Sequence, residues 1–322
     1  EKYMVTIWRN QKKILLIVAL FFTIFSFSQI SWNSVTTPLE GNLVSVCFTD
    51  LQHGYILSED GMLAQTSDAG LSWEISALGN GTFTDLCFTD ELHGCVVGYQ
   101  DSSFIMLTED GGNSWSQSDH LKAQYLNDVF FIDPMNAWVV GLRDDMNYNL
   151  YSQNGGQSWT AQMDIFVMEG NLFSISFRDD LRGSTCGKDG IFLLTNSGGS
   201  NGWALDVSIP QLGVDLYSVH NWGDQTGCAV GENGTALYTI NNWAQHIETN
   251  TSTDLDLYDV ASAGASFVWA VGDGGMIQYT SNYLLGWVTQ ATGVTEDLRS
   301  ICMIDALNGW AVGSNATVLH YG

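Results

Sequence analysis

Alternating apolar and polar side chains predict short β-strands along almost the whole chain beyond residue 30. Segments such as 42–50 (NLVSVCFTD) and 82–90 (TFTDLCFTD) are rich in β-branched and aromatic residues, and their apolar positions recur every second residue. Clusters of Gly, Asn, Asp and Ser separate these segments, as expected of turns between strands. No helical periodicity of 3.6 residues competes outside the N-terminal region. The pattern therefore predicts an all-β chain.

The predicted strands fall into repeats marked by tryptophan. Each repeat holds an inner strand such as NLVSVCFTD, a second such as HGYILS, a third that ends at a turn, and a fourth that carries the periodic tryptophan. Four short strands in a repeat of about 40 residues are typical of a β-propeller blade. The marking residues lie 40 to 44 residues apart and are Trp32, Trp73, Trp115, Trp159, Trp203, Trp243 and Trp287.

Counting the repeats predicts a seven-bladed propeller. Six are complete, and the seventh begins at Asp297 and reaches Gly322 after its third strand. The segment 30–35 contains Trp32 one period before Trp73 and has no blade of its own. We expect this N-terminal strand to complete the last blade, which would close the ring and remove its exposed edges. The alternative is a chain truncated before its last strand.

The first residues predict a secretory signal peptide. Three basic residues precede an apolar core at 14–25, and a small-x-small cleavage site follows at 26–28. The apolar run is too short to predict a transmembrane helix. We therefore expect residues 1–28 to be removed, with no stable membrane span afterwards. Residues 29–322 would form one propeller domain of an exported protein, located in the periplasm, on the cell surface or outside the cell.

The charge of the expected mature chain is strongly negative. Residues beyond 28 hold 34 acidic and 6 basic side chains, a net charge of −28. Such a surface repels phosphate backbones and anionic lipid headgroups, which argues against nucleic-acid partners. Basic partners, cations and neutral glycans remain compatible with it.

The six cysteines occupy repeat positions that predict small buried side chains rather than a disulfide framework. Cys47, Cys87 and Cys302 share one inner-strand position, and Cys95 and Cys228 share one in the second strand. A Cys87–Cys95 disulfide remains open. No spacing typical of metal ligands is present, so we expect no metal and no cofactor.

Three turns follow one pattern, [ST]-x-[DN]-x-G-x-S-W. The short acidic or amide side chain is expected to accept hydrogen bonds from its own turn, and the glycine to adopt positive φ. The tryptophan is expected to pack between blades. The later copies, before Trp203, Trp243 and Trp287, depart from the pattern. The residues of the three matching copies are Asp68, Gly70 and Trp73; Asp110, Gly112 and Trp115; and Asn154, Gly156 and Trp159.

This turn resembles the Asp-box, or bacterial neuraminidase repeat. The full repeat, with V-x-F-x-D, then G-W-A-V-G, then the turn, is most similar to propellers of the photosystem II assembly-factor type and their secreted bacterial relatives. The resemblance covers residues 30–322 and implies that the Asp-boxes are structural. The family with these repeats also includes sialidases, which bind the carboxylate of their substrate with three arginines. The expected mature chain has only Arg143, Arg178, Arg182 and Arg299 and is highly acidic, so we do not expect sialidase activity.

Positions that differ between blades are free to serve function. In the inner strand the fifth position is always aliphatic, and the fourth is Ser or Asp, as expected beside a wet channel. The third is divergent and lies near the strand start, on the face opposite the Asp-boxes. In the last four blades it holds Phe173, Tyr217, Tyr258 and Arg299, and the strand starts add Asp215, Asp256 and Asp297.

These seven residues form the predicted ligand site. Aromatic platforms with carboxylates and one arginine suit a protein segment or a neutral sugar, so we predict a monomeric, non-catalytic binding module. One alternative is that the aromatics only pack between blades. Another is a glycoside hydrolase that uses a pair among Asp215, Asp256, Asp259 and Asp297.

Overall fold

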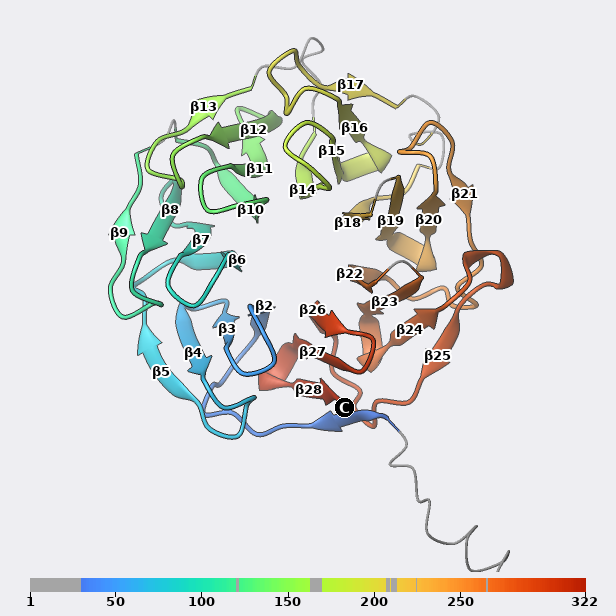
Figure 1. Ribbon diagram of the computed structural model, residues 1–322, viewed down its shortest axis with the longest axis horizontal. Helices are drawn as coiled ribbons and strands as arrows, with labels where there is room; N and C mark the ends of the chain where they lie inside the picture. Colours follow the sequence, from blue (N-terminus) through green and yellow to red (C-terminus); the bar gives the residue numbers. More distant parts are fainter. Residues whose placement is uncertain are drawn as a thin grey trace, which may run out of the picture. The chain divides into compact units, whose positions relative to one another are not determined.

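A computed structural model describes residues 30–119, 122–162, 170–206, 209, 213–223, 225–264 and 266–322. The predicted signal peptide lies outside these residues. Residues Ser31–Gly322 form one compact unit, a ring of seven four-stranded antiparallel sheets (Figure 1). No helix in the described part of the chain is long and apolar enough to cross a bilayer. The seven-bladed propeller is therefore confirmed.

Each of the first six blades contains four consecutive strands, and the innermost strand comes first in the sequence. The first three blades are β2(Leu43–Phe48), β3(Gly54–Ser58), β4(Met62–Thr66) and β5(Glu74–Ala77); β6(Thr82–Phe88), β7(Gly94–Tyr99), β8(Ser103–Thr108) and β9(Ser116–Gln117); and β10(Tyr125–Phe131), β11(Ala137–Arg143), β12(Met146–Ser152) and β13(Thr160–Ala161). The next three are β14(Leu172–Phe177), β15(Gly183–Gly187), β16(Phe192–Thr195) and β17(Ala204–Leu205); β18(Leu216–Trp222), β19(Thr226–Gly231), β20(Ala236–Thr239) and β21(Ile247–Glu248); and β22(Leu257–Ala263), β23(Phe267–Gly272), β24(Ile277–Thr280) and β25(Val288–Gln290).

The seventh blade joins the two ends of the ring. Its strands are β26(Leu298–Asp305), β27(Asn308–Gly313), β28(Val318–Tyr321) and β1(Trp32–Ser34). Trp32 pairs with Tyr321 and Ser34 with Leu319, so the N-terminal strand runs antiparallel to the C-terminal one. The predicted closure is confirmed. Short 3-10 turns complete the described elements: η1(Lys188–Gly190), η3(Glu232–Gly234), η4(Asp273–Gly275), η5(Tyr283–Leu285) and η6(Ser314–Ala316).

The Asp-box turns have the expected local geometry. Asp68 accepts hydrogen bonds from the Thr66 hydroxyl and from the Ser72 amide and hydroxyl, at 2.6–2.8 Å. Asp110 accepts the equivalent hydrogen bonds in the second blade. In the third, Asn154 accepts from the Ser152 hydroxyl and the Ser158 amide, and its side-chain amide donates to the Ser158 hydroxyl. These side chains stabilise their own turns, which agrees with a structural role.

One departure from the sequence pattern keeps this geometry. In the fifth blade the Asn241 side chain accepts from the Gln245 amide, and the Thr239 hydroxyl accepts from the Trp243 amide. Trp243 therefore occupies the glycine position of the turn, at φ 61°, and reaches the blade interface from there.

Aromatic side chains fill several interfaces between blades, which we call seams. In three seams a ring from the second strand of one blade stacks on a phenylalanine at the end of the next inner strand. The stacked pairs are Tyr55 on Phe88, Trp138 on Phe177 and Trp310 on Phe48, with centroids 3.5, 3.7 and 4.7 Å apart. A periodic tryptophan meets each phenylalanine edge-on: Trp115, Trp203 and Trp73, respectively.

The six cysteines are free thiols. Cys87 and Cys95 face each other across β6 and β7 but are not bridged. The aliphatic fifth position of every inner strand is buried, as the sequence predicted.

Candidate functional site

The third position of every inner strand is the extra residue of a β-bulge. In each blade the pairing of the inner two strands shifts register there, for example between Leu216 and Ser218 around Tyr217. A bulge leaves its extra residue unpaired and turns the side chain away from the regular alternation. The position that differs most between blades is therefore the position that the backbone leaves free.

In the last four blades, the bulge residue of each blade contacts the bulge residue of the next. Phe173 lies 5.8 Å from Tyr217 and Tyr217 5.4 Å from Tyr258, measured between ring centroids. The Arg299 guanidinium lies 4.2 Å from the centroid of the Tyr258 ring, within the range of a cation–π contact. The three rings are half-buried and the arginine is exposed. We call Phe173, Tyr217, Tyr258 and Arg299 the mouth arc.

The first three blades use the same position differently. Thr84 donates a hydrogen bond to the Leu126 carbonyl of the next blade, and Asn127 donates to the Leu172 carbonyl. Val44 packs with the apolar cluster between the first two blades. Large aromatic side chains at the bulge are thus confined to one side of the ring.

The three aspartates at the strand starts have a structural task that the sequence analysis missed. Each accepts a backbone N–H from the 3-10 turn of the preceding blade and so links two neighbouring blades. A signal was available, because the residue directly before the inner strand is acidic only in the three blades that follow a KDG, ENG or DGG turn. The pairs are Asp215 with the Asp189 amide (2.7 Å), Asp256 with the Asn233 amide (2.9 Å) and Asp297 with the Gly274 amide (3.0 Å).

The field around the mouth arc is negative. Burial raises the pKa of the Tyr217 hydroxyl above its ordinary value, and the nearby charges of Asp256, Glu232 and Asp215 raise it further. Burial and the hydrogen bond to Asp273, 2.6 Å long, raise the pKa of Tyr258 to about 12. The tyrosine hydroxyls therefore stay protonated over the physiological range, and in this form they can donate hydrogen bonds.

The loops on either side of the arc carry charges of both signs. Arg299 also lies 3.2 Å from Asp297, and Arg143 lies 3.6 Å from Asp144. Near the Phe173 end, a hollow of about 620 Å³ is lined by Leu142, Asp145, Gly170, Asn171, Lys188 and Asp189.

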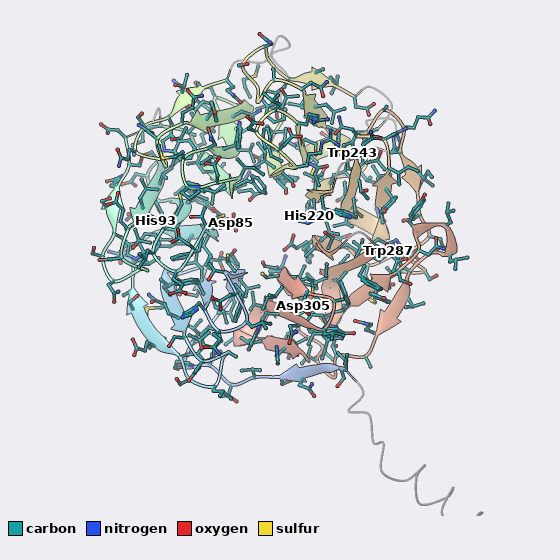
Figure 2. All side chains as sticks on the ribbon, viewed as in Figure 1. Asp85, His93, His220, Trp243, Trp287 and Asp305 are labelled. Atoms are coloured by element: carbon teal, nitrogen blue, oxygen red, sulfur yellow. The ribbon has the colours of Figure 1, made fainter. Side chains whose placement is uncertain are left out.

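Below the mouth, side chains at the fourth inner-strand position connect the neighbouring blades at all seven seams. The sequence predicted only a wet channel there, whereas the structure shows Ser and Asp side chains hydrogen-bonding across each seam. Figure 2 shows Asp85 at the inner edge of the ring. In ring order the bonds join Ser45 to Asp85, Asp85 to the Val129 amide, Asp128 to the Ile175 amide, Ser174 to the Val219 amide, Ser218 to Asp259, Asp259 to the Ile301 amide and Ser300 to the Val46 amide.

We call these Ser and Asp side chains the belt. Burial raises the pKa values of its carboxyl groups. The pKa of Asp85 is raised well above its ordinary range by burial and by the adjacent Asp128, with which it shares a hydrogen bond. Burial raises the pKa of Asp259 to about 6. Above the ordinary pKa of an aspartate, Asp85 therefore keeps a proton that the same carboxyl loses in the unfolded chain.

This proton makes stability depend on pH. Because the pKa is raised on folding, the contribution of Asp85 is full at low pH and is lost as the pH rises. As the pH rises from about 4.5 towards neutrality, we expect the slope of the free energy of unfolding against pH to be more negative for the wild type than for Asp85→Asn, by up to about 1.4 kcal/mol per pH unit. Denaturant titrations across this range measure the difference. Both proteins keep His53 and His220, so equal slopes would contradict the assignment.

The hydrogen bonds of the four candidate aspartates do not favour the glycoside hydrolase alternative. Asp215, Asp256 and Asp297 each commit one oxygen to an inter-blade hydrogen bond. Asp259 faces the channel, where the Ile301 and Val260 amides and the Ser218 hydroxyl occupy its two oxygens. A retaining or inverting pair needs two carboxyls free to act on one bond. Each member of the predicted set is instead bound to the scaffold.

The chain has detectable relatives among characterised proteins, although no protein-family model matches it. It is 23% identical over 137 residues to the photosystem II assembly lipoprotein Ycf48 of Synechococcus sp. (strain CC9902), a match covering 41% of this chain and 40% of the relative. The chain is similar to Ycf48 proteins. A second Ycf48, from Synechocystis sp., is 34% identical over 71 residues, 22% of this chain and 20% of the relative. The matches span less than half of these relatives.

Solved structures share the fold over most of the chain. YCF48 bound to a D1 peptide superposes with a TM-score of 0.72 at 17% identity, covering 91% of this chain and 99% of that one. YCF48 from Cyanidioschyzon merolae gives 0.70 at 19% identity, covering 90% and 98%. A GH74 xyloglucanase from Xanthomonas campestris gives 0.68 at 10% identity, covering 90% and 53%. At these identities the likeness concerns the fold, which binding proteins and glycosidases share.

Proposed function

We propose that this protein is an exported, non-catalytic propeller that binds an extended segment of a partner protein across the mouth arc, in the manner of an assembly factor. The observation that carries the proposal is the arc itself: four bulge residues from four successive blades form a continuous, partly exposed row of side-chain contacts. The similarity to Ycf48, one structure of which holds a D1 peptide, supports a protein segment as the ligand class.

The chemistry of the arc narrows the ligand. Partly exposed aromatic faces can bind apolar side chains and cations, and the Arg299–Tyr258 contact within the arc supports a guanidinium as one such cation. Carboxylates surround the two tyrosines, so a segment with basic or neutral side chains fits better than an acidic one. Arg299 offers a donor for one backbone carbonyl or carboxylate of the segment.

We expect Tyr217→Ala/Tyr258→Ala to reduce partner recovery at least tenfold, because aromatic anchors dominate such interfaces. The measurement is affinity capture from the envelope fraction of the producing cell, with bound proteins and glycans quantified separately. Val44→Ala/Thr84→Ala changes the same bulge position in the first two blades and is the matched control. The control should capture the partner as the wild type does.

Three results would overturn the proposal. Equal recovery of every protein by the wild type and the tyrosine variant would remove the arc as the site. Loss of binding in the control alone would move the site to the other side of the ring. Capture of glycan but no protein would show that the ligand is a glycan and not a protein segment. Circular dichroism melting curves establish that each variant is folded.

A further inference from the structure

The seam between the second and third blades lacks the stacked ring found in three others. Its second-strand position holds Cys95, where Tyr55, Trp138 and Trp310 stand in the first, third and seventh blades. The phenylalanine that would receive such a ring is Phe131. It is half-buried, whereas Phe48, Phe88 and Phe177 are 8, 6 and 2% exposed.

A second substitution keeps Phe131 from closing this gap. In the first, second and fourth blades the phenylalanine lies against the glycine with which it pairs in the sheet. A Cβ added to Gly54, Gly94 or Gly183 would stand only 2.3–2.6 Å from the ring. The partner of Phe131 is Ala137, whose Cβ excludes the ring from that place. Phe131 therefore cannot fold back over its own blade.

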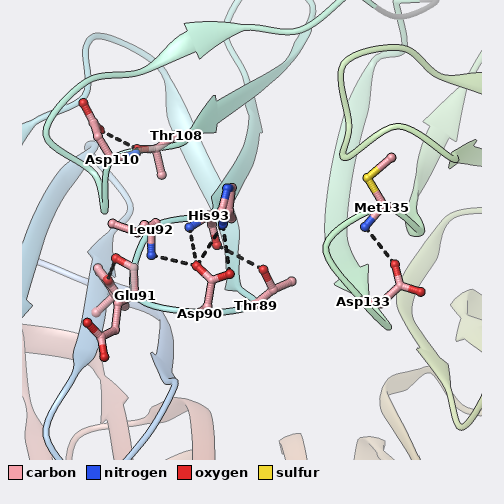
Figure 3. A network of polar contacts seen from close by, with 10 residues as sticks. Thr89, Asp90, Glu91, Leu92, His93, Thr108, Asp110, Asp133 and Met135 are labelled. Carbon is pink, nitrogen blue, oxygen red and sulfur yellow. Dashed lines mark hydrogen bonds and ion pairs between the residues drawn. The ribbon is translucent and has the colours of Figure 1, made fainter.

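The two substitutions leave a pocket that opens on the Asp-box face. Its volume is about 180 Å³, and an apolar cavity of about 150 Å³ is enough to bind benzene. Phe131 lines one wall and Leu107, which pairs with Cys95 in the sheet, lines another. Figure 3 shows the two turns beside it, with His93 held by Asp90 on one side and Met135 above Asp133 on the other.

The pocket also has the polar groups that hold the rings of other seams. The Tyr55 hydroxyl donates to the Glu91 carbonyl of the next blade (3.0 Å), and the Trp138 indole N–H donates to the Gly198 carbonyl (3.2 Å). The equivalent residues in the third blade are Pro134 and Gly155. Both line the pocket. An aromatic ring stacked on Phe131 would thus find a carbonyl in either direction.

A small residue at this position does not by itself make a pocket. Cys228 occupies it in the fifth blade, but Trp222, Tyr238 and Trp287 fill that seam. The opening between the second and third blades depends on Cys95 and Ala137 together.

We propose that this pocket binds one planar aromatic group with an N–H or O–H donor, an indole or a phenol, stacked on Phe131 as Trp138 is stacked on Phe177. The donor bonds the Gly155 or Pro134 carbonyl. The group is a tryptophan or tyrosine side chain of a bound polypeptide or a free small molecule. The site is on the face opposite the mouth arc and does not depend on the function proposed for that arc.

Titration of the purified protein with indole and p-cresol, followed by calorimetry, tests the proposal. We expect saturable binding with a dissociation constant of about 1 mM or lower for ligands of this size. Phe131→Leu keeps an apolar wall but removes the stacking face, and should weaken binding at least fivefold. Cys95→Trp fills the pocket from inside and should abolish it. Tyr217→Ala/Tyr258→Ala should bind as the wild type does.

The outcomes distinguish a polypeptide side chain from a small molecule as the ligand, and the seam pocket from the mouth arc as the site. Tighter binding of a Gly-Trp-Gly peptide than of indole supports a polypeptide side chain, and exclusion of the peptide supports a small molecule. No saturation by either probe up to 10 times the expected constant, about 10 mM, overturns the proposal. Binding unchanged by Phe131→Leu, or lost only with the two tyrosines, also overturns it. If Cys95→Trp does not fold, the Phe131→Leu comparison decides alone.

Discussion

Replacing Trp32 with alanine is expected to lower the free energy of unfolding by about 3–5 kcal/mol. Trp32 is 5% exposed, although it stands on a strand of only three residues. Its ring packs against Tyr321, with centroids 5.1 Å apart, and its indole N–H donates to the Gln290 side chain at 2.8 Å. The same side chain thus joins the N-terminal strand to the seventh blade and to the sixth.

The expected loss is large because Trp32 holds the closure of the ring. Without its packing, β1 would separate from β28 and leave an unpaired edge, which promotes association between chains. Denaturant unfolding at pH 7, with size-exclusion chromatography, measures both effects. Asn33→Ala, on the same strand but exposed, should change stability by less than about 0.5 kcal/mol. A Trp32→Ala protein within about 1 kcal/mol of the wild type would show that the closure is not cooperative with the ring.

The sequence predicted the ring because its strongest signals are periodic. A tryptophan every 40 to 44 residues identifies the repeat, and an orphan Trp32 one period before Trp73 identifies the closing strand. Both inferences depend only on spacing. The contact among the mouth-arc residues was predictable for a related reason, since the third inner-strand position varies among seven copies while the fourth is always Ser or Asp and the fifth is always aliphatic.

Other features depend on contacts between repeats and were not predictable in the same way. Asp215, Asp256 and Asp297 were predicted to contact a ligand, and the structure adds a hydrogen bond from each to the turn of the preceding blade. The belt of Ser and Asp side chains at the fourth position follows the same logic, because a small polar residue can face water or a neighbouring amide equally well. Spacing along the chain does not distinguish the two, and the geometry of the seam does.

The seam pocket illustrates the same limit. Cys95 in place of an aromatic residue and Ala137 in place of glycine are both unremarkable changes when each is considered alone. Their effect appears only because β7 of one blade faces β10 of the next, so that the missing ring and the displaced Phe131 share one space. Departures from the repeat pattern are therefore most informative where two of them meet in one seam.

We expect Trp138→Ala to destabilise the protein by about 3–5 kcal/mol and Cys95→Ala by about 1 kcal/mol or less. Trp138 is fully buried, stacked between Phe177 and Tyr151, and its indole N–H is hydrogen-bonded. Cys95 occupies the equivalent position but contributes only a small side chain. Thermal and denaturant unfolding of the two variants compare the stability contributed by the Trp138 ring with that contributed by Cys95 at the equivalent position.

The Trp138→Ala protein should also be rescued by indole. Removing this ring creates a second stacking site, with Phe177 as its wall and the Gly198 carbonyl as its acceptor. A ligand that binds only the folded state raises stability by about 1.4 kcal/mol at ten times its dissociation constant. Indole should therefore stabilise Trp138→Ala more than it stabilises Trp138→Ala/Phe177→Leu. Equal stabilisation of the two would mean that stacking on the seam phenylalanine does not hold the ring, and would weaken the assignment made for Phe131.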